Sequence, residues 1–177
     1  MKKLIFLTVC LVAFAANGFA QKSFRGEKGV SSVGLIMGHA VSSKAFTLGA
    51  DFRYNIEDKI RLAPSALYTL KNDNFTSLYL NADAHYLTRV TKDITIFPIG
   101  GVGVSLRKIY GIPVLGIGGV ELKSDSETKL RVGLNLGFGG EIRATDDIII
   151  GAEFKYNLTT ERIYDQAMLL ARVAYYF

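Results

Sequence analysis

Residues 48–56 read LGADFRYNI, and this stretch decides the fold. Every second position is apolar or tyrosine, and the positions between them hold glycine, charged residues or asparagine. Because successive side chains of a β-strand point to opposite faces, this alternation predicts a strand with one apolar and one polar face. A helix would instead repeat its apolar residues every three or four positions.

The same alternation recurs along the rest of the chain, in segments that are long for strands. Strands of soluble sheets average ~5 to 6 residues, whereas these segments reach the ~9 to 11 residues that cross a bilayer at a ~45° tilt. The other segments are Val30–Val41, Ile60–Leu70, Leu78–Val90, Ile94–Leu106, Leu130–Arg143, Ile148–Leu158 and Leu169–Phe177. With residues 48–56 they predict an all-β fold, an eight-stranded antiparallel up-and-down transmembrane β-barrel.

The composition of the polar faces indicates which face lines the barrel. These faces combine charged residues with many glycines, among them Gly49, Gly101 and Gly137. Small and charged side chains fill the inside of a narrow barrel, whereas the outside of a soluble barrel would be richer in Lys, Glu and Gln. The apolar faces are therefore expected to face lipid. The alternative is a soluble ligand-binding barrel with its apolar face inside, because the two-residue alternation does not show which face points inward.

The connections differ in length in the way that outer-membrane barrels require. Residues 56–60, 90–94 and 144–148 are tight polar turns that end in isoleucine, and we expect them on the periplasmic side. Two longer connections, 107–129 and 159–166, then lie on the outer side. The other two outer connections, 42–44 and 72–75, are short, so the difference in length depends mainly on 107–129.

The N-terminus has the features of a secretory signal peptide. Lys2 and Lys3 precede the apolar run Leu4–Ala16, and small residues stand before a cleavage site after Ala20. We predict a signal peptide at residues 1–20 and a barrel domain at 21–177. Cleavage would remove two of the 21 Lys and Arg residues, lowering the net charge from +5 to +3, which does not favour nucleic acid as a partner. It would also remove Cys10, the single cysteine, and with it thiol chemistry and disulfides.

Charged residues of the inward faces are predicted to form a network inside the barrel. An eight-stranded barrel is just wide enough for side chains to fill, so these groups must pair with one another. We interpret the network as structural. The alternative is a narrow pore, which the excess of arginine in this network would make selective for anions. The residues are Asp51, Arg53, Arg61, Asp83, His85, Arg89, Arg131, Glu141, Arg143, Glu153, Lys155 and Arg172.

An enzymatic function is the second alternative. His39 falls on the lipid face at the outer end of its strand, with Ser42 and Ser43 just beyond, where a Ser/His site could meet lipid A. No carboxylate on the same face would orient His39, so we expect no enzyme. The sequence shows no metal cluster or nucleotide loop, and no catalytic, cofactor or metal site is predicted.

Loop 107–129 is the best candidate for contact with another protein. Residues 112–122 are apolar on both faces and rich in glycine, and exposed apolar surface on an outer loop usually has a partner. Residues 112–122 either extend the two flanking strands as a hairpin or fold against the barrel mouth.

Several motifs resemble those of the outer-membrane β-barrel domain proteins of Bacteroidetes-type Gram-negative bacteria. They are the leader end Phe19-Ala20-Gln21, Phe97-Pro98-Ile99-Gly100-Gly101, Gly-Ala-Glu-Phe-Lys-Tyr at 151–156 and Ala174-Tyr175-Tyr176-Phe177. The architecture is similar to that of the OmpA and OmpX barrels. The resemblance implies an outer-membrane location in contact with membrane lipid. It also implies that Val173, Tyr175 and Phe177 form the signal read by the barrel-assembly machinery. It supplies no activity.

Overall fold

The computed structural model describes residues 28–72, 75–109, 114–115, 121–122, 127–161 and 164–177. The predicted signal peptide at residues 1–20 lies outside them. Within the described residues, no helix is long and apolar enough to cross a membrane.

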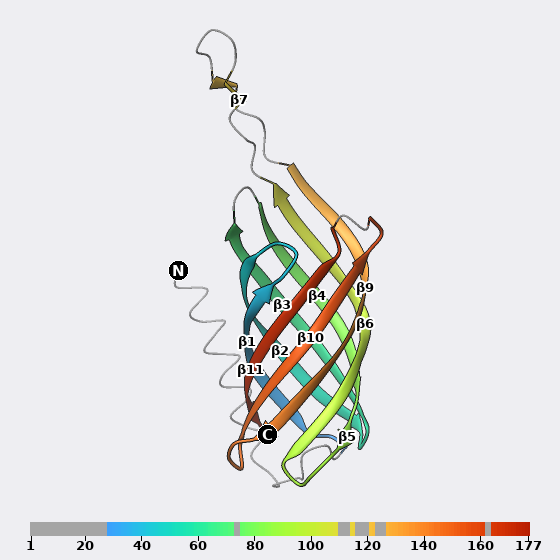
Figure 1. The fold of residues 1–177 in the computed structure, drawn as a ribbon. Coiled ribbons are helices and arrows are strands. Elements are labelled where there is room, and N and C mark those ends of the chain that lie inside the picture. The colour runs from blue at the N-terminus through green and yellow to red at the C-terminus, as the bar shows by residue number, and fades with distance from the viewer. Residues whose placement is uncertain (1–27, 73–74, 110–113, 116–120, 123–126, 162–163) are drawn as a thin grey trace, which may run out of the picture.

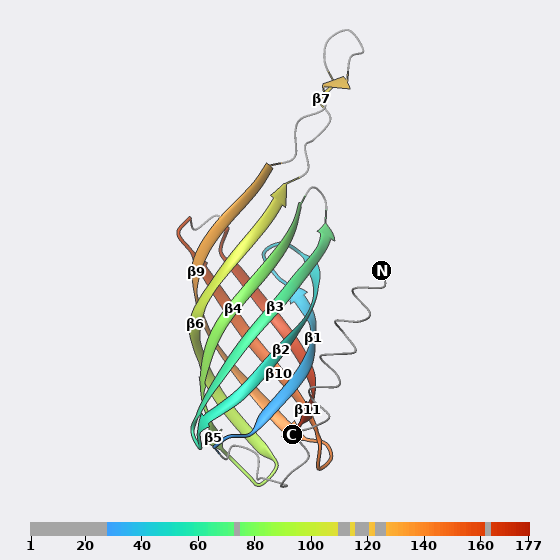
Figure 2. The same ribbon diagram turned by 180° about the vertical axis from the view of Figure 1, so that it is seen from behind.

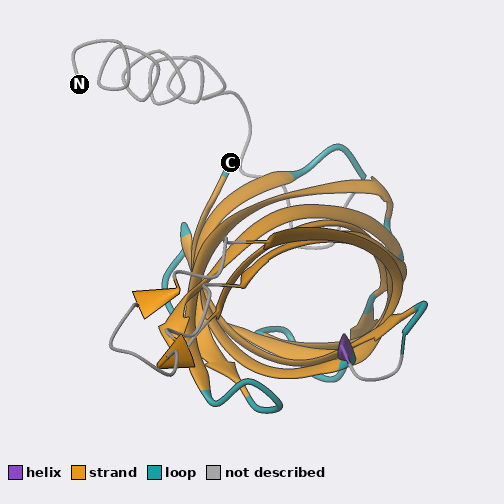
Figure 3. Ribbon diagram, turned by 90° about the horizontal axis from the view of Figure 1, so that it is seen from above, coloured by secondary structure: helices purple, strands orange, loops and turns teal. Residues whose placement is uncertain are grey.

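Eight long antiparallel strands form a closed barrel, which confirms the predicted fold class (Figures 1 and 3). The ring order is β1-β2-β3-β4-β6-β9-β10-β11, and the pairing of β1 with β11 closes it. Two-residue strands β7 and β8 pair with each other outside the ring. The strands are β1 (Ser31–Ala40), β2 (Ala45–Glu57), β3 (Ile60–Asn72), β4 (Phe75–Tyr86), β5 (Thr88–Arg89), β6 (Ile94–Ile109), β7 (Val114–Leu115), β8 (Glu121–Leu122), β9 (Glu127–Arg143), β10 (Ile148–Thr159) and β11 (Gln166–Tyr176).

The short strand β5 continues β4 in the same register. His85 pairs with Ile99 on β6, and Thr88 pairs with Ile96, so no residue is inserted between the two pairs. Leu87 interrupts the ladder, and its N–H donates to the carbonyl oxygen of Lys59 at 2.7 Å. The predicted segment 78–90 is thus one strand of the barrel with a local break.

The two ends of the barrel differ as the sequence predicts. At one end, called here the short-turn end, the connections are 58–59, 90–93 and 144–147. The Thr91 hydroxyl accepts the Ile94 N–H at 3.0 Å, and the Thr145 hydroxyl accepts the Ile148 N–H at 3.1 Å. These side-chain bonds explain why two of the three turns have threonine as their second residue and are followed by isoleucine. The opposite end is called the long-loop end.

The apolar faces point outward along all eight strands. Leu35 is 69% exposed and Phe138 is 65% exposed, whereas Asn135, next to an outward leucine, is 0% exposed. This orientation contradicts the soluble ligand-binding barrel, which would turn its apolar face inward.

Figure 2 shows β1 to β4 and β6 crossing the back of the barrel side by side.

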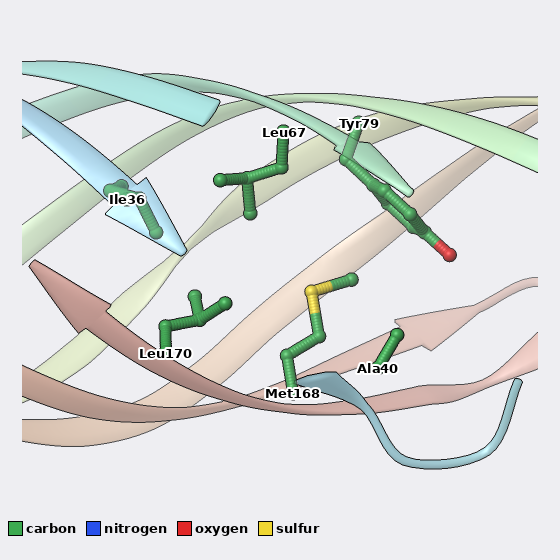
Figure 4. Close-up of a cluster of buried hydrophobic side chains, with 6 residues drawn as sticks. All are labelled: Ile36, Ala40, Leu67, Tyr79, Met168 and Leu170. Carbon is green, nitrogen blue, oxygen red and sulfur yellow. The ribbon is translucent and has the colours of Figure 1, made fainter. Parts of the chain in front are cut away.

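The inside is less uniformly polar than the sequence predicts. A buried apolar cluster lies in the half of the barrel nearer the long-loop end (Figure 4). A second cluster of Leu87, Phe97 and Ile99 lies near the short-turn end. Arg53, Arg61 and His85 lie against Phe97 of this second cluster, so the charged side chains there have little access to water. The first cluster consists of Ile36, Ala40, Leu67, Tyr79, Met168 and Leu170.

Candidate functional site: the barrel interior

The structure brings nine of the twelve predicted interior residues together, all of them buried. They come from strands that are distant in sequence but face one another across the lumen. These nine are Asp51, Arg53, Arg61, Asp83, His85, Glu141, Glu153, Lys155 and Arg172.

Arg53 is the hub of the network because its guanidinium contacts three carboxylates. Its Nε donates to Asp51 Oδ2 at 2.7 Å, and its Nη1 lies 3.4 Å from Glu141 Oε2. Its Nη2 pairs with Glu153 on β10. A planar guanidinium has five N–H donors in a fixed fork, so arginine is suited to hold several carboxylates at once. Strands β2, β9 and β10 are thereby joined through the lumen.

Asp51 is shared between two arginines. Besides the bond from Arg53, it accepts a bond from Arg172 Nε on β11 at 2.8 Å. Arg172 Nη2 also donates to the Ser32 hydroxyl on β1 at 3.0 Å. This group therefore adds side-chain bonds across the seam between β1 and β11, where the barrel closes.

Arg61 combines an ion pair with two aromatic contacts. Its Nη1 donates to Glu141 Oε1 at 2.8 Å, and its Nη2 lies 3.1 Å from His85 Nδ1. The guanidinium carbon lies 4.7 Å from the ring centroid of Phe97, and the His85 ring stacks on the same phenyl ring. The side chains of Arg61 and His85 thus both pack against the Phe97 ring, away from solvent.

A second group of polar side chains surrounds Asp83. Lys155 Nζ donates to Asp83 Oδ2 at 2.6 Å, and Asn135 Nδ2 donates to Asp83 Oδ1 at 2.7 Å. The amide of Asn135 also donates to Asn81 Oδ1 at 3.0 Å and accepts a bond from Asn157 Nδ2 at 2.6 Å. Strands β4, β9 and β10 are joined in this way.

The buried network is balanced in charge, which corrects the expected excess of arginine. Among the residues that the structure describes, four buried cationic side chains face four buried carboxylates, so this network has no net charge that would select anions. The cations are Arg53, Arg61, Lys155 and Arg172, and the carboxylates are Asp51, Asp83, Glu141 and Glu153.

The other three predicted members lie outside the buried network. Arg89 is exposed at the short-turn end, and Arg143, the last residue of β9, is half-buried there. Arg131 is half-buried toward the long-loop end. All three have the inward phase of their strands, but a two-residue period fixes only the face of a side chain. The position along the barrel axis depends on where each strand ends.

Arg131 belongs instead to a cluster at the long-loop end, which we call the mouth cluster: Arg107, Arg131, Glu161 and Tyr164. The two guanidinium carbons each lie 5.1 Å from the Tyr164 ring centroid. Arg131 Nη2 also lies 3.0 Å from Glu161 Oε1. The connection between β10 and β11 is thereby held against β6 and β9.

Sequence reasoning missed Phe97 and Tyr164 as members of these clusters. Phe97, Pro98 and Ile99 are three consecutive apolar residues, so period alone does not show which of them face inward. The phase set by Thr95 and Gly101 could have placed Phe97 inside. Tyr164 lies in a connection, where no strand phase exists.

The residues considered for an enzymatic site are arranged differently from a catalytic pair. His39 is exposed on the outer face of β1. The Ser43 hydroxyl donates to the Ala40 carbonyl oxygen at 3.4 Å, and the Ser42 hydroxyl accepts the Ala167 N–H at 3.5 Å. Both serines therefore bond to backbone groups. Among the described residues, no group of three or more His, Cys, Asp or Glu side chains could hold a metal ion.

The predicted assembly signal lies on the last strand. Val173 and Tyr175 point outward and are 51% and 42% exposed, and the Tyr175 and Phe177 rings lie 6.4 Å apart. The N–H of Phe177 donates to the Ser31 carbonyl oxygen at 2.9 Å, which extends the pairing of β11 with β1 to the terminal residue. These residues thus lie at the seam of the barrel.

Comparisons with known proteins agree with this architecture. The model of the family described as outer membrane protein beta-barrel domain matches residues 6–177. No curated protein sequence matches the chain.

Solved structures of similar fold have low sequence identity. The N-terminal β-barrel domain of OprF from Pseudomonas aeruginosa has 17% identity and a TM-score of 0.63, over 85% of this chain and 98% of that one. Neisserial surface protein A has 15% identity and a TM-score of 0.61, over 86% and 98%. The attachment invasion locus protein of Yersinia pestis, solved with the heparin analogue sucrose octasulfate, has 16% identity and a TM-score of 0.56, over 84% and 98%. At such identities the similarity shows the fold alone.

Proposed function

The chain belongs to the outer membrane protein β-barrel domain family, and on this premise we propose that it is a non-catalytic, non-conducting surface protein of the outer membrane. Its barrel anchors the chain in lipid, and loop 107–129 presents a binding surface to another protein outside the cell. The short-turn end then faces the periplasm. The origin in a Bacteroidetes-type bacterium and export by the signal peptide at 1–20 stay predictions.

The observation that carries this proposal is the unequal length of the strands. Strand β9 pairs with β6 as far as Glu127, whereas its pairing with β10 ends at Gly133. The six residues between these points extend the β6–β9 ladder by about 20 Å along the strand, at ~3.4 Å per residue. Figure 1 shows β6 and β9 reaching beyond the ends of β10 and β11, and this extension supports the role of a platform for the loop.

The extension also offers apolar surface. Leu130 and Val132 point outward from it and are 59% and 54% exposed. The apolar segment 112–122 predicted as a contact surface lies mostly outside the described residues. Within it, β7 and β8 pair with each other in an antiparallel manner, which favours a hairpin over a loop that folds against the barrel mouth.

The interior supports a structural role rather than conduction. The two buried charge groups join strands that face one another across the lumen, and two apolar clusters fill further parts of the interior. A hydrated ion would have to break several buried ion pairs to pass, at several kcal/mol for each charge left unpaired. The outer-membrane lipid and the barrel-assembly machinery, through Val173, Tyr175 and Phe177, are the other partners that we propose.

Surface labelling of a cysteine tests the orientation and the exposure of the loop together. With Cys10 removed in the leader, the variant Ser124→Cys has one thiol on the proposed outer loop, and Asp146→Cys has one thiol on a short turn. A membrane-impermeant maleimide added to intact cells should label Ser124→Cys and leave Asp146→Cys unlabelled until the outer membrane is opened. The reverse pattern would invert the orientation.

Conductance tests the remaining alternative of a narrow channel. The purified protein in a planar bilayer should give no current steps above the detergent background. Reproducible steps would replace the structural role with transport.

A further inference from the structure

A groove of about 780 Å³ lies on the lipid-facing surface of β9, β10, β11, β1 and β2. This volume is within the ~300 to 1,000 Å³ of typical small-molecule sites. The groove is a feature of the outer wall, and Glu153 is the residue that it shares with the charged network. Its lining includes Phe138, Gly140, Ala152, Phe154 and Ala171.

The groove exists because three neighbouring strands have very small residues side by side. Ala152 on β10 pairs with Gly140 on β9 and with Ala171 on β11. The next outward row nearer the long-loop end consists of large side chains, since Phe154 pairs with Phe138 and with Leu169. The small residues form a floor, and this row forms a wall.

The groove rises obliquely through one half of the barrel. Its β9 end lies at Gly140, three residues before the end of β9 at the short-turn end. Its other end reaches His39, one residue before the end of β1 at the long-loop end. Crossing from β9 to β1 covers three strand spacings of ~4.8 Å, or about 14 Å. In the orientation proposed above, the groove runs from deep in the bilayer to the outer interface.

We propose that this groove holds an acyl chain of lipid A, the phosphorylated lipid of the outer leaflet. This inference rests on the orientation in the proposed function. The lining is mainly apolar: Glu153 belongs to it, but its buried side chain pairs with Arg53 inside the barrel, and His39 is the exposed polar side chain, at the interfacial end. An acyl chain therefore fits the deep part and a polar head group the upper part. Exposed Ser42 and Lys44 follow His39 in the turn and give the phosphates of the head group further polar contacts.

An acyl chain fits this shape better than a second copy of the barrel. The groove is an open depression with aromatic side chains along one wall, where the Phe138 and Phe154 rings lie 5.6 Å apart. The outward side chains of a second barrel lie on a broad convex surface, which would contact the wall and leave the floor empty.

Filling the floor tests the proposal. In Ala152→Leu/Ala171→Leu the added side chains occupy the groove, whereas Ala82→Leu adds the same side chain to an outward alanine of β4 that does not line it. Native mass spectrometry of the detergent-purified proteins, titrated with lipid A, counts the bound lipid. The filled variant should bind lipid A about tenfold more weakly, equivalent to ~1.4 kcal/mol, and Ala82→Leu should bind like the wild type.

Two further probes separate the possible sources of a signal. A diacyl phospholipid should bind more weakly than lipid A. His39→Ala should weaken the binding of lipid A, but it should not change the binding of lipid A that lacks its phosphates. Equal binding of both lipids, equal loss in the filled and control variants, or a dimer that the filling disrupts would each overturn the proposal.

A photoreactive lipid A acyl chain provides a test that needs no groove variant to fold. In the wild type, cross-links should fall on β9–β11 rather than on β3–β6, and an even spread would contradict a specific groove. The cysteine labelling above reports orientation independently, so an inverted barrel is distinguished from an empty groove.

Discussion

Lys155 on β10 donates to Asp83 on β4 across the lumen, with 2.6 Å between Nζ and Oδ2. These strands are not neighbours in the ring, because β6 and β9 lie between them. The pair therefore connects walls that backbone hydrogen bonds do not join.

We expect Asp83→Ala to destabilise the barrel by about 3 to 5 kcal/mol, because it leaves the buried Lys155 ammonium without its carboxylate. The double variant Asp83→Ala/Lys155→Met should recover much of this loss, since no unpaired charge remains. Urea unfolding in lipid vesicles, followed by heat-modifiable migration on gels, measures both. If the single variant were as stable as the wild type, the pair would have no structural role.

Two glycines provide a matched test of the narrow interior. A Cβ atom on Gly139 would lie 2.6 Å from a ring carbon of Phe97 and 2.9 Å from Cγ of Glu153, whereas one on Gly100 would meet nothing within 4 Å. Gly139→Ala should therefore cost about 1 to 3 kcal/mol in the same unfolding assay, and Gly100→Ala should be close to neutral. Similar costs at both positions would mean that strand propensity, rather than interior space, favours glycine here.

Alternation predicts the fold and the face of most side chains because the period of a strand is a local property. It assigns Leu134 to lipid and Asn135 to the interior, as the structure has them. Partners across the lumen are a different matter. That Lys155 meets Asp83 depends on how the strands are staggered around the ring, which no single segment of sequence encodes.

The barrel ends depart from the predicted pattern for a related physical reason. Arg89 and Arg143 have the inward phase, yet Arg89 is exposed and Arg143 is only half-buried where their strands end. Inward Ile36 and Met168 show that a narrow barrel can also be filled by apolar packing. A sequence pattern predicts the face of the strand on which a side chain lies. Packing around the ring decides which side chains it contacts and how deeply it is buried.

Substitutions at two successive positions of β9 test the facing of the strand. Leu134→Arg puts a charge on the lipid face, one residue from the point where the pairing of β9 with β10 ends toward the long-loop end. Its cost should therefore be nearer the ~0 to 1 kcal/mol of an interfacial arginine than the ~2 to 4 kcal/mol of an arginine at mid-membrane. From the position of Asn135 on the polar face of its strand alone, we would predict only a small loss of stability for Asn135→Ser. The hydrogen bonds of Asn135 with Asn81, Asp83 and Asn157 raise this expectation to about 1 to 3 kcal/mol.

Unfolding in vesicles of different hydrocarbon thickness separates the two effects. The cost of Leu134→Arg should change with thickness, because it depends on depth in the bilayer, whereas that of Asn135→Ser should not. A thickness-dependent cost at Asn135 and a constant one at Leu134 would place the strand phase one residue out.

The mouth cluster is expected to order the connection between β10 and β11. The Tyr164 ring lies 5.1 Å from the guanidinium carbon of both Arg107 and Arg131, and each such contact contributes ~0.5 to 1 kcal/mol at an exposed site. Tyr164→Ala should therefore increase amide hydrogen exchange of residues 159–165 by about fivefold to thirtyfold, if both contacts act together. Tyr164→Phe keeps the aromatic ring and should exchange like the wild type.

The neighbouring ion pair provides the internal comparison for that experiment. Arg131 Nη2 lies 3.0 Å from Glu161 Oε1, but the Glu161 side chain is 53% exposed, so solvent screens this pair. Glu161→Gln should consequently change exchange far less than Tyr164→Ala, and raising the salt concentration should reduce the difference between Glu161→Gln and the wild type. If Glu161→Gln loosened the connection as much as Tyr164→Ala, the ion pair would hold it, and stacking on Tyr164 would be incidental.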